Sequence, residues 1–253
     1  MYNIMHNSKS GMIASQGKID IISNNITNAQ TTGYKKLDIG FLDLYKETLN
    51  RPSYPNNSHD SITGTGVKVS QTTRNFNQGS LKNTSIKTNI AIDGEGLFRV
   101  IRPDGTYAYT RNGELNLDSS GRLVDDNGNI LDIEFNNGMG YNEIDLGDGE
   151  LNINKLGQVF LNKQEIGKIN LYESKGNNDF ISVGDSLFVP IKDTEVKITD
   201  NPNIMQGYIE MSNVSMQNEM TDLIMAQRTF QSNSSGIKAV DEMWSMINNL
   251  QGK

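Results

Sequence analysis

Two segments of the sequence combine residue types that carry chemistry in other proteins, and each lacks part of the pattern that its chemistry requires. Residues 11–18, GMIASQGK, are similar to a phosphate-binding loop. However, five residues instead of four separate the glycines, no Ser or Thr follows the lysine, and the segment lies in a predicted helix. In residues 125–129, DDNGN, the glycine is displaced from its place in a calcium loop and no Glu occupies the twelfth position. We predict a hairpin turn there.

The remaining candidates for catalysis are equally incomplete. His6 and His59 are the only histidines, and neither has a second ligand or a serine partner at a useful spacing. Carboxylates are plentiful, but no pair is marked as a glycosidase acid and nucleophile, so we interpret them as solvated surface residues. The absence of cysteine excludes disulfides and thiolate metal sites. We therefore expect no enzyme, no catalytic residue, no cofactor and no metal.

Composition excludes further classes. The 253 residues carry a net charge of -7, and no basic stripe exists to neutralise phosphates, so nucleic acid is not an expected partner. Nothing indicates a small-molecule substrate. No run of about 20 apolar residues predicts a transmembrane segment, and the first residues, MYNIMHNSKSGM, lack the apolar core of a cleaved secretory signal. A hydrophobic content of 35% with 24 glycines favours an elongated protein of several parts over a single large core.

The two ends of the chain share a seven-residue apolar spacing, which places these residues on one stripe of a helix. We expect helices over residues 3–29 and from Ser215, a suitable N-cap, to about residue 250. The stripes are predicted to bring the two ends together or to contact neighbouring subunits. The predicted subunit-interface residues are Met5, Met12, Ile19, Ile22 and Ile26 in the first helix and Met216, Met220, Leu223, Phe230, Ile237, Val240, Trp244 and Ile247 in the second.

The sequence between the two predicted helices differs from them in composition and periodicity. Residues 24–36 are polar and predict a helix stop and a turn in which Gly33 is free to take a positive φ. Residues 51–66, rich in Pro, Asn, Ser and Gly, are the best candidate for an exposed loop or linker. From residue 67 to 189, short alternating runs are separated by turn signals, as in the hairpin predicted around residues 103–105, PDG. Residues 114–124 are echoed by residues 150–160, which indicates a repeated β unit or shared turn chemistry.

We therefore predict an α+β fold in which the N- and C-terminal helices pair as an α-helical coiled-coil domain beside a central antiparallel all-β domain. The predicted domains are residues 1–36 with 210–253 for the helices, 37–66 for a linker or extended segment, and 67–209 for the β domain.

Four segments resemble those of the bacterial flagellar rod and hook proteins. Residues 23–36 (SNNITNAQTTGYKK), 88–128 and 206–234 are similar to the signature segments of this family, in the same order and at the same spacing. Residues 64–85, the short length and the phrase QGYIEMSNV are most similar to distal-rod members. The proximal rod subunits and the much longer hook protein are looser matches.

The resemblance implies a structural subunit of the basal-body rod in the cell envelope. Such a subunit polymerises with copies of itself into a helical tube that transmits motor torque to the hook. It meets other rod and hook proteins and passes through the flagellar type III export apparatus without a cleaved signal. The resemblance also places a turn that leaves the first helix, and it implies that residues 51–66 stiffen subunit packing. The turn residues are Asn25, Asn28, Thr32, Gly33 and Tyr34.

Other functions stay open at this point. A proximal rod or hook-type axial subunit has the same terminal helices. A secreted cell-wall-acting enzyme or carbohydrate-binding module would place its activity on the β domain, although the sequence names no acid or nucleophile for it. An adhesin-like tail protein is a weaker alternative.

Overall fold

The structure of the chain is a computed structural model that describes residues 2–44, 46–48, 62–136, 141, 146, 149–174, 176, 179–191, 194–199 and 202–251. The chain forms two compact units. The helical unit comprises Met1–Thr27, Leu37–Thr73 and Ser215–Lys253, and the β unit comprises Asn28–Lys36 and Arg74–Val214. These units group the residues differently from the predicted domains, since 28–36 belong to the β unit and 37–73 to the helical unit.

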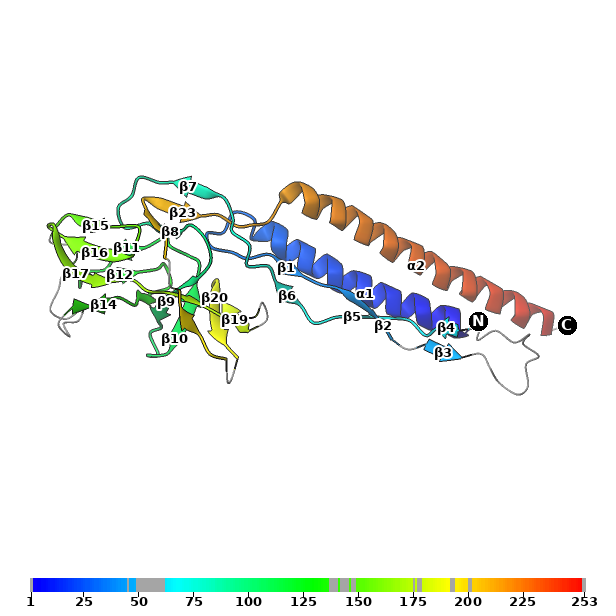
Figure 1. The fold of residues 1–253 in the computed structure, drawn as a ribbon. Helices are drawn as coiled ribbons and strands as arrows, with labels where there is room; N and C mark the ends of the chain where they lie inside the picture. The colour runs from blue at the N-terminus through cyan, green and yellow to red at the C-terminus, as the bar shows by residue number, and fades with distance from the viewer. Residues whose placement is uncertain are drawn as a thin grey trace. The chain divides into compact units, whose positions relative to one another are not determined.

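The helical unit is built on two helices that lie side by side and run in opposite directions (Figure 1). Helix α1 spans Tyr2–Thr27 and helix α2 spans Met216–Gln251, close to the predicted bounds. Ser215 directly precedes α2, and its carbonyl accepts a hydrogen bond from the Glu219 amide at 3.0 Å. The two predicted helices are confirmed.

Short extended strands accompany α1 in the same unit. Strand β2 (Phe41–Asp43) pairs antiparallel with β5 (Val67–Val69), and β3 (Lys46–Thr48) pairs with β4 (Ile62–Gly64). Strand β1 (Leu37–Asp38) pairs with β6 (Thr73–Arg74). Strand β5 contacts α1, where a Cβ added at Gly17 would lie 3.4 Å from a Val69 methyl carbon. Residues 49–61, which include most of the predicted 51–66 loop, lie outside the described residues.

The β unit contains an antiparallel sheet of nine strands in the order β11-β12-β13-β9-β10-β20-β19, with β18 added to β9 and β21 to β18. A second sheet has the order β14-β17-β16-β15, and β22-β8 and β23-β7 form two-stranded pairs. The strands are β7 (Leu81–Asn83), β8 (Ile90–Ile92), β9 (Leu97–Ile101), β10 (Tyr107–Thr110), β11 (Asn116–Leu117), β12 (Leu123–Val124), β13 (Ile130–Leu131), β14 (Glu134–Phe135), β15 (Leu151–Ile153), β16 (Gln158–Leu161), β17 (Gln164–Lys168), β18 (Leu171–Glu173), β19 (Phe180–Gly184), β20 (Leu187–Pro190), β21 (Lys197–Ile198), β22 (Ile204–Gln206) and β23 (Tyr208–Glu210).

The predicted hairpins are confirmed. Strands β9 and β10 pair in the register Phe98↔Thr110 and Val100↔Ala108, around a turn in which the Gly105 amide donates to the Arg102 carbonyl. The echoed segments both form hairpins, β11–β12 and β15–β16. Their turns are equivalent, since Gly121 donates to Asp118 and Gly157 to Asn154, and both glycines have positive φ, 67° and 80°.

One apolar core joins the two large sheets of the β unit. Phe98, Val100 and Leu123 from the nine-stranded sheet and Ile153 and Val159 from the four-stranded sheet belong to the same buried cluster. A smaller aromatic cluster is built from Tyr109, Tyr172 and Phe188, with Leu97 among them and Phe76 packed against it. Burial of about 25 cal/mol for each Å² of apolar surface makes this core the main source of stability in the unit.

Candidate subunit interface

The two segments that resemble a phosphate-binding loop and a calcium loop form a helix and a turn. Residues 11–18 lie within α1, as predicted. At residues 125–129, one Asp125 carboxylate oxygen accepts hydrogen bonds from the Asn127 and Asn129 amides, and the other accepts from the Asn129 side chain. The predicted hairpin turn is therefore confirmed. In the part of the chain that the structure describes, no group of three His, Cys, Asp or Glu side chains is placed to hold a metal ion. His6 is exposed on α1, and His59 lies outside the described residues.

The two helices meet through small and polar side chains. Near one end of the pair, the buried Asn25 amide donates to a Glu219 carboxylate oxygen at 3.1 Å. Gly11 lies fourteen residues before Asn25 in α1, and Asn233 lies fourteen residues after Glu219 in α2. A Cβ added at Gly11 would lie 2.7 Å from the Asn233 side-chain nitrogen. Ser8 lies three residues before Gly11, and Gly236 lies three residues after Asn233. A Cβ added at Gly236 would lie 3.0 Å from the Ser8 hydroxyl oxygen. Steps of fourteen and three residues are whole heptads and the a-to-d spacing, so the antiparallel register is constant over this length.

The buried stripe follows that register. On α2 it runs through the buried Glu219, Ala226 and Val240 and the partly buried Asn233, and on α1 it includes Ser15, Ile22 and Asn25. The small residues Ser15 and Ala226 of this stripe, together with Gly11, let the two backbones approach closely. The large residues of the predicted stripes therefore lie beside the contact, and only Ile22 and Val240 among them are fully buried, at 3% exposure each.

The other predicted interface residues retain solvent exposure within the single chain. Met5, Met220, Trp244 and Ile247 are exposed. Partly buried are Met12, Ile19, Ile26, Met216, Leu223, Phe230 and Ile237.

The predicted stripes of the two helices face the same side of the pair. On α1, Met12 and Ile19 follow the contact positions by one residue, which is a turn of about 100° around the axis. On α2, Leu223 and Phe230 precede the contact positions by three residues, which is equivalent to a turn of about 60° in the same sense around that helix's own axis. Because the two helices face each other and are antiparallel, turns of the same sense lead to the same side of the pair. Strand β5 packs on the other side, near Gly17 of α1.

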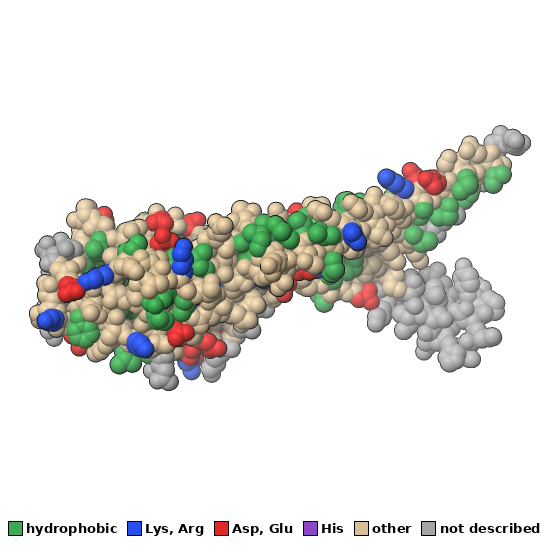
Figure 2. Space-filling view, turned by 90° about the horizontal axis from the view of Figure 1, so that it is seen from above, with side chains coloured by type: hydrophobic (Ala, Val, Ile, Leu, Met, Phe, Trp, Pro, Cys, Tyr) green, Lys and Arg blue, Asp and Glu red, His purple; other side chains and the backbone are tan. Residues whose placement is uncertain are grey.

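Hydrophobic side chains are also visible on the surface of α2. Figure 2 shows them gathered along this helix, including the stretch near its C-terminal end. The exposed apolar residues of α2 are Met220, Ile224, Met225, Trp244, Met246, Ile247 and Leu250.

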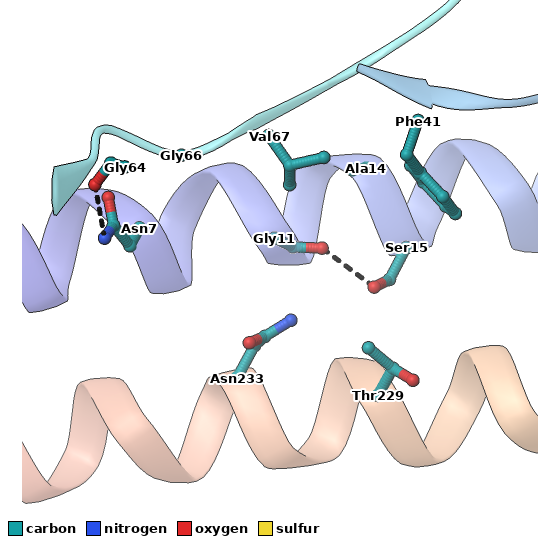
Figure 3. A pocket seen from close by; sticks show the side chains of 10 residues that line it. All are labelled: Asn7, Gly11, Ala14, Ser15, Phe41, Gly64, Gly66, Val67, Thr229 and Asn233. Atoms are coloured by element: carbon teal, nitrogen blue, oxygen red, sulfur yellow. Dashed lines mark hydrogen bonds between the residues drawn. The ribbon is translucent and has the colours of Figure 1, made fainter. Parts of the chain in front are cut away.

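A groove opens on the helical unit between α1, α2 and the strands that follow α1 (Figure 3). It has a volume of about 600 Å³. The Asn7 side chain donates to the Gly64 carbonyl at 3.3 Å, which connects α1 with strand β4, and the Ser15 hydroxyl donates to the Gly11 carbonyl at 2.8 Å within α1. The lining residues are Asn7, Gly11, Ala14, Ser15, Phe41, Gly64, Gly66, Val67, Thr229 and Asn233.

Asn25 marks the end of α1 and is the first of the five predicted turn residues. Its side chain donates to the Leu37 carbonyl at 2.8 Å and accepts from the Leu37 amide at 3.0 Å, as a paired strand would. Together with its bond to Glu219, these contacts connect α1, β1 and α2 through one buried amide group.

The other turn residues lie in the β unit. The Thr31 hydroxyl donates to the Asn28 side chain at 3.3 Å, and the Thr32 hydroxyl donates to Glu114 at 3.0 Å. Tyr34 is buried, and the Arg74 guanidinium lies 5.6 Å from its ring centroid.

Gly33 of this turn takes the predicted positive φ, 68°, and donates its amide to the Glu210 carbonyl at 2.8 Å. A Cβ at Gly33 would lie 2.4 Å from the Asn112 nitrogen. Only glycine therefore fits here, for reasons of both space and conformation.

A buried ionic cluster fixes this turn to the end of the β unit. Lys35 and Arg111 both pair with Glu210, at 2.6 and 3.0 Å, and all three side chains are at most 4% exposed. Glu210 also accepts from the Gly79 amide at 2.8 Å, while Lys35 donates to the Asn77 carbonyl at 2.8 Å. Burial lowers the pKa of Lys35 from its usual 10.5, Glu210 opposes this shift, and Arg111 adds to it. We call Lys35, Arg111 and Glu210 the clasp.

The clasp was not predicted from the sequence. Lys35 and Glu210 are 175 residues apart, and Arg111 and Glu210 are 99 residues apart. No local pattern distinguishes these charges from solvated ones. The only sequence signal was that Lys35 and Glu210 both lie in segments that resemble the flagellar family.

Models of three families match the chain: the flagella basal body rod protein at residues 5–35, the D1 domain of flagellar hook protein FlgE/F/G at residues 91–161, and the C-terminal part of flagellar basal body rod FlgEFG proteins at residues 205–250. The flagellar basal-body rod protein FlgG of Borreliella burgdorferi is 33% identical over 264 aligned residues, which cover 99% of each chain. The chain belongs to the FlgG family of flagellar basal-body rod proteins. The FlgG protein of Agrobacterium fabrum is 32% identical over 94% of this chain and 95% of its own length.

The similarity to hook proteins covers a smaller part of the chain. The flagellar hook protein FlgE of Helicobacter mustelae is 40% identical over 129 residues, which are 48% of this chain and 28% of that protein. As a member of the FlgG family, the chain is a structural protein of the bacterial flagellar basal-body rod. Neither helix, over its described residues, is long and apolar enough to cross a membrane.

Proposed function

We propose that the chain is a distal-rod subunit that assembles with copies of itself into a helical tube, which transmits motor torque to the hook. In this proposal its partners are other rod and hook proteins, and it leaves the cell through the flagellar type III export apparatus without a cleaved signal peptide. It acts by assembly and carries out no reaction. The nearly full-length similarity to proteins named FlgG supports the distal position over a proximal or hook-type one.

The observation that carries this proposal is the apolar surface that remains on the helical unit after its two helices have paired. The helices use Gly11, Ala226 and other small residues to meet each other. Larger apolar residues, including Phe230 and Ile237, remain partly exposed on one side of the pair, and Met220 is 52% exposed. Monomeric proteins rarely expose contiguous apolar surface of this kind, because it favours association. Neighbouring copies would cover it.

We further propose that α1 and α2 pair as a coiled coil and that this pair forms the subunit-interface domain. The constant register from Asn25–Glu219 to Ser8–Gly236, with its heptad steps, supports this geometry. The thirteen predicted residues would then divide their roles. Ile22 and Val240 stabilise the pair within one chain, and the eleven others contact neighbours.

The clasp lies where the chain enters and leaves the β unit. Residues 28–36 enter the β unit, and β23 ends at Glu210, shortly before α2. Because Lys35 and Glu210 are paired and buried, the two ends of the β unit are held together. A β unit whose entry and exit are held together in this way suits a subunit that must transmit torque.

The proposal is tested by replacing apolar residues of the exposed side with Asp. Met220→Asp changes an exposed residue and leaves the fold of the chain intact, while Phe230→Asp and Ile237→Asp change partly buried ones. We expect all three variants to lose rod assembly and motility in a strain that lacks the natural copy. The matched control is Ile181→Asp in the β unit, since Ile181 is 56% exposed and lies outside the helical unit. Normal filaments and swimming with Met220→Asp, at a normal cellular level of the protein, would overturn the proposal.

A further inference from the structure

The end of α2 extends beyond α1. In the register set by Asn25–Glu219 and Gly11–Asn233, the first residue of α1, Tyr2, lies opposite Glu242. Residues 243–251 therefore have no part of α1 opposite them. We call residues 243–251, MWSMINNLQ, the α2 tip. Met246 is 59% exposed, Ile247 37% and Leu250 80%.

We propose that the α2 tip of one copy docks in the groove between α1, α2 and β5 of another copy. This inference rests on the proposed function, because it specifies one contact of the polymer. The occupant is a second copy of this chain, inserted through Met246, Ile247 and Leu250.

The tip cannot reach the groove of its own chain. Asn233 lines the groove, and Leu250 lies seventeen residues further along the same continuous helix. At 1.5 Å per residue, these positions are about 25 Å apart along the helix axis. The contact must therefore join two molecules.

The tip and the groove match in chemistry. None of the ten residues that line the groove is charged, and none of the nine residues of the tip is charged. Docking therefore desolvates no ion, which would otherwise oppose the contact. Phe41 and Val67 offer an apolar wall to the aliphatic side chains of the tip (Figure 3). Asn7 and Thr229 offer polar groups to Asn248 and Asn249 of the tip.

The groove also has a suitable size and wall composition. A volume of about 600 Å³ falls within the range of pockets that bury whole ligands. Gly11, Ala14 and Gly66 contribute little or no side-chain volume to its lining. Gly66 also lies close to α1, since an added Cβ would be 2.4 Å from the Ser10 hydroxyl oxygen.

The geometry of this contact favours a filament. The tip and the groove are different surfaces of the same molecule, so each copy that docks its tip still presents an open groove to the next copy. Contacts of this head-to-tail type generate rings or open helical polymers instead of closed dimers.

Cysteine cross-linking tests the inference directly, since the chain contains no cysteine. Copies with Leu250→Cys are mixed with copies that carry Thr229→Cys, polymerised and oxidised. We expect a disulfide-linked dimer that contains one chain of each variant. A mixture of Leu250→Cys with Ile181→Cys is the control for random collision. If polymers form and the first mixture gives no more dimer than the control, the docking proposal is wrong and the proposed function stands. If the unaltered chain forms no polymer under any condition, the proposed function itself fails.

Two further variants report the strength of the contact. Leu250→Asp places a charge on the tip, and Thr229→Phe fills the groove at a residue that is exposed in the single chain. Each should raise the critical concentration for polymerisation by about tenfold or more, while the helical circular dichroism of the monomer stays unchanged. An unchanged critical concentration for both variants would contradict the proposal.

Discussion

Glu210→Gln should destabilise the β unit much more than Lys35→Met, although the two residues form one ion pair. The clasp contains two cations and one carboxylate, all buried. Removal of the carboxylate leaves Lys35 and Arg111 facing each other without a counter-charge. Removal of the Lys35 charge leaves Glu210 and Arg111, a balanced pair. The difference between these variants is therefore electrostatic.

The expected magnitudes follow from this asymmetry. Uncompensated buried charge costs about 3–5 kcal/mol, and for a unit of this size that lowers the melting temperature by roughly 6–20 °C. Lys35→Met loses the hydrogen bonds of one ammonium group and should cost about 1–2 kcal/mol. Urea unfolding followed by the near-ultraviolet circular dichroism of tyrosine measures the β unit, whose aromatic cluster includes Tyr109 and Tyr172. The single tryptophan, Trp244, lies in the helical unit and serves as an internal reference.

The pH dependence gives a second readout. Burial lowers the pKa of folded Lys35 below its usual 10.5, so between the two values the unfolded chain binds more protons than the folded chain. Stability from this group therefore rises with pH in that window. Because Glu210→Gln removes the carboxylate that opposes the shift, the pKa of Lys35 falls further and the rise begins at a lower pH. The double variant Glu210→Gln, Lys35→Met removes the titrating group and should lack this rise. Equal destabilisation by the two single variants at pH 7, or no difference in pH slope between the Glu210→Gln variant and the double variant, would refute the reasoning.

Two glycine positions give further predictions. Gly33→Ala should cost more than the roughly 1–3 kcal/mol that a positive φ alone imposes, because its Cβ would lie 2.4 Å from the Asn112 nitrogen. Gly105→Ala should cost only about 1–2 kcal/mol, because Gly105 also has a positive φ of 79° but no atom of the described residues lies within 4 Å of an added Cβ. Equal losses of stability in thermal unfolding would count against the clash. In α1, Gly11→Ala gains about 1 kcal/mol of helix propensity but meets Asn233, so it should stabilise the chain only when combined with Asn233→Ala. Urea unfolding followed by Trp244 fluorescence measures this, and full stabilisation by Gly11→Ala alone would contradict the close approach of the helices.

The sequence predicted the elements better than their contacts. Heptad spacing located α1 and α2 because apolar periodicity depends only on local geometry. It did not identify the face that pairs within the chain, since that face uses Gly11, Ser15 and Ala226, which hydrophobic patterns overlook. Turn chemistry located the β hairpins for the same local reason. The clasp could not be predicted from the sequence, because its charged residues become neighbours only after both ends of the β unit have folded.

The predicted turn shows how family resemblance and physics complement each other. The resemblance named Asn25 and Gly33 without a reason for their identity. The structure supplies the reason, since the Asn25 side chain makes three hydrogen bonds, two with Leu37 and one with Glu219, and a Cβ at Gly33 would collide with backbone. The predicted domain boundaries, in contrast, were based on changes in local amino-acid composition and periodicity. From the sequence, residues 37–44 and 62–73 were assigned to a linker and to the β domain, whereas the structure groups them with the helices.

The antiparallel pairing of α1 and α2 has a consequence for the order of folding. Asn25 and Glu219 are 194 residues apart, so α1 cannot meet its partner until nearly the whole chain is available. An isolated helix of this length with two interior glycines is marginal in water, and contacts of such long range form slowly. The first residues of the chain therefore stay without their final structure while the rest arrives. The helical unit therefore becomes ordered only after both ends of the chain are available to pair.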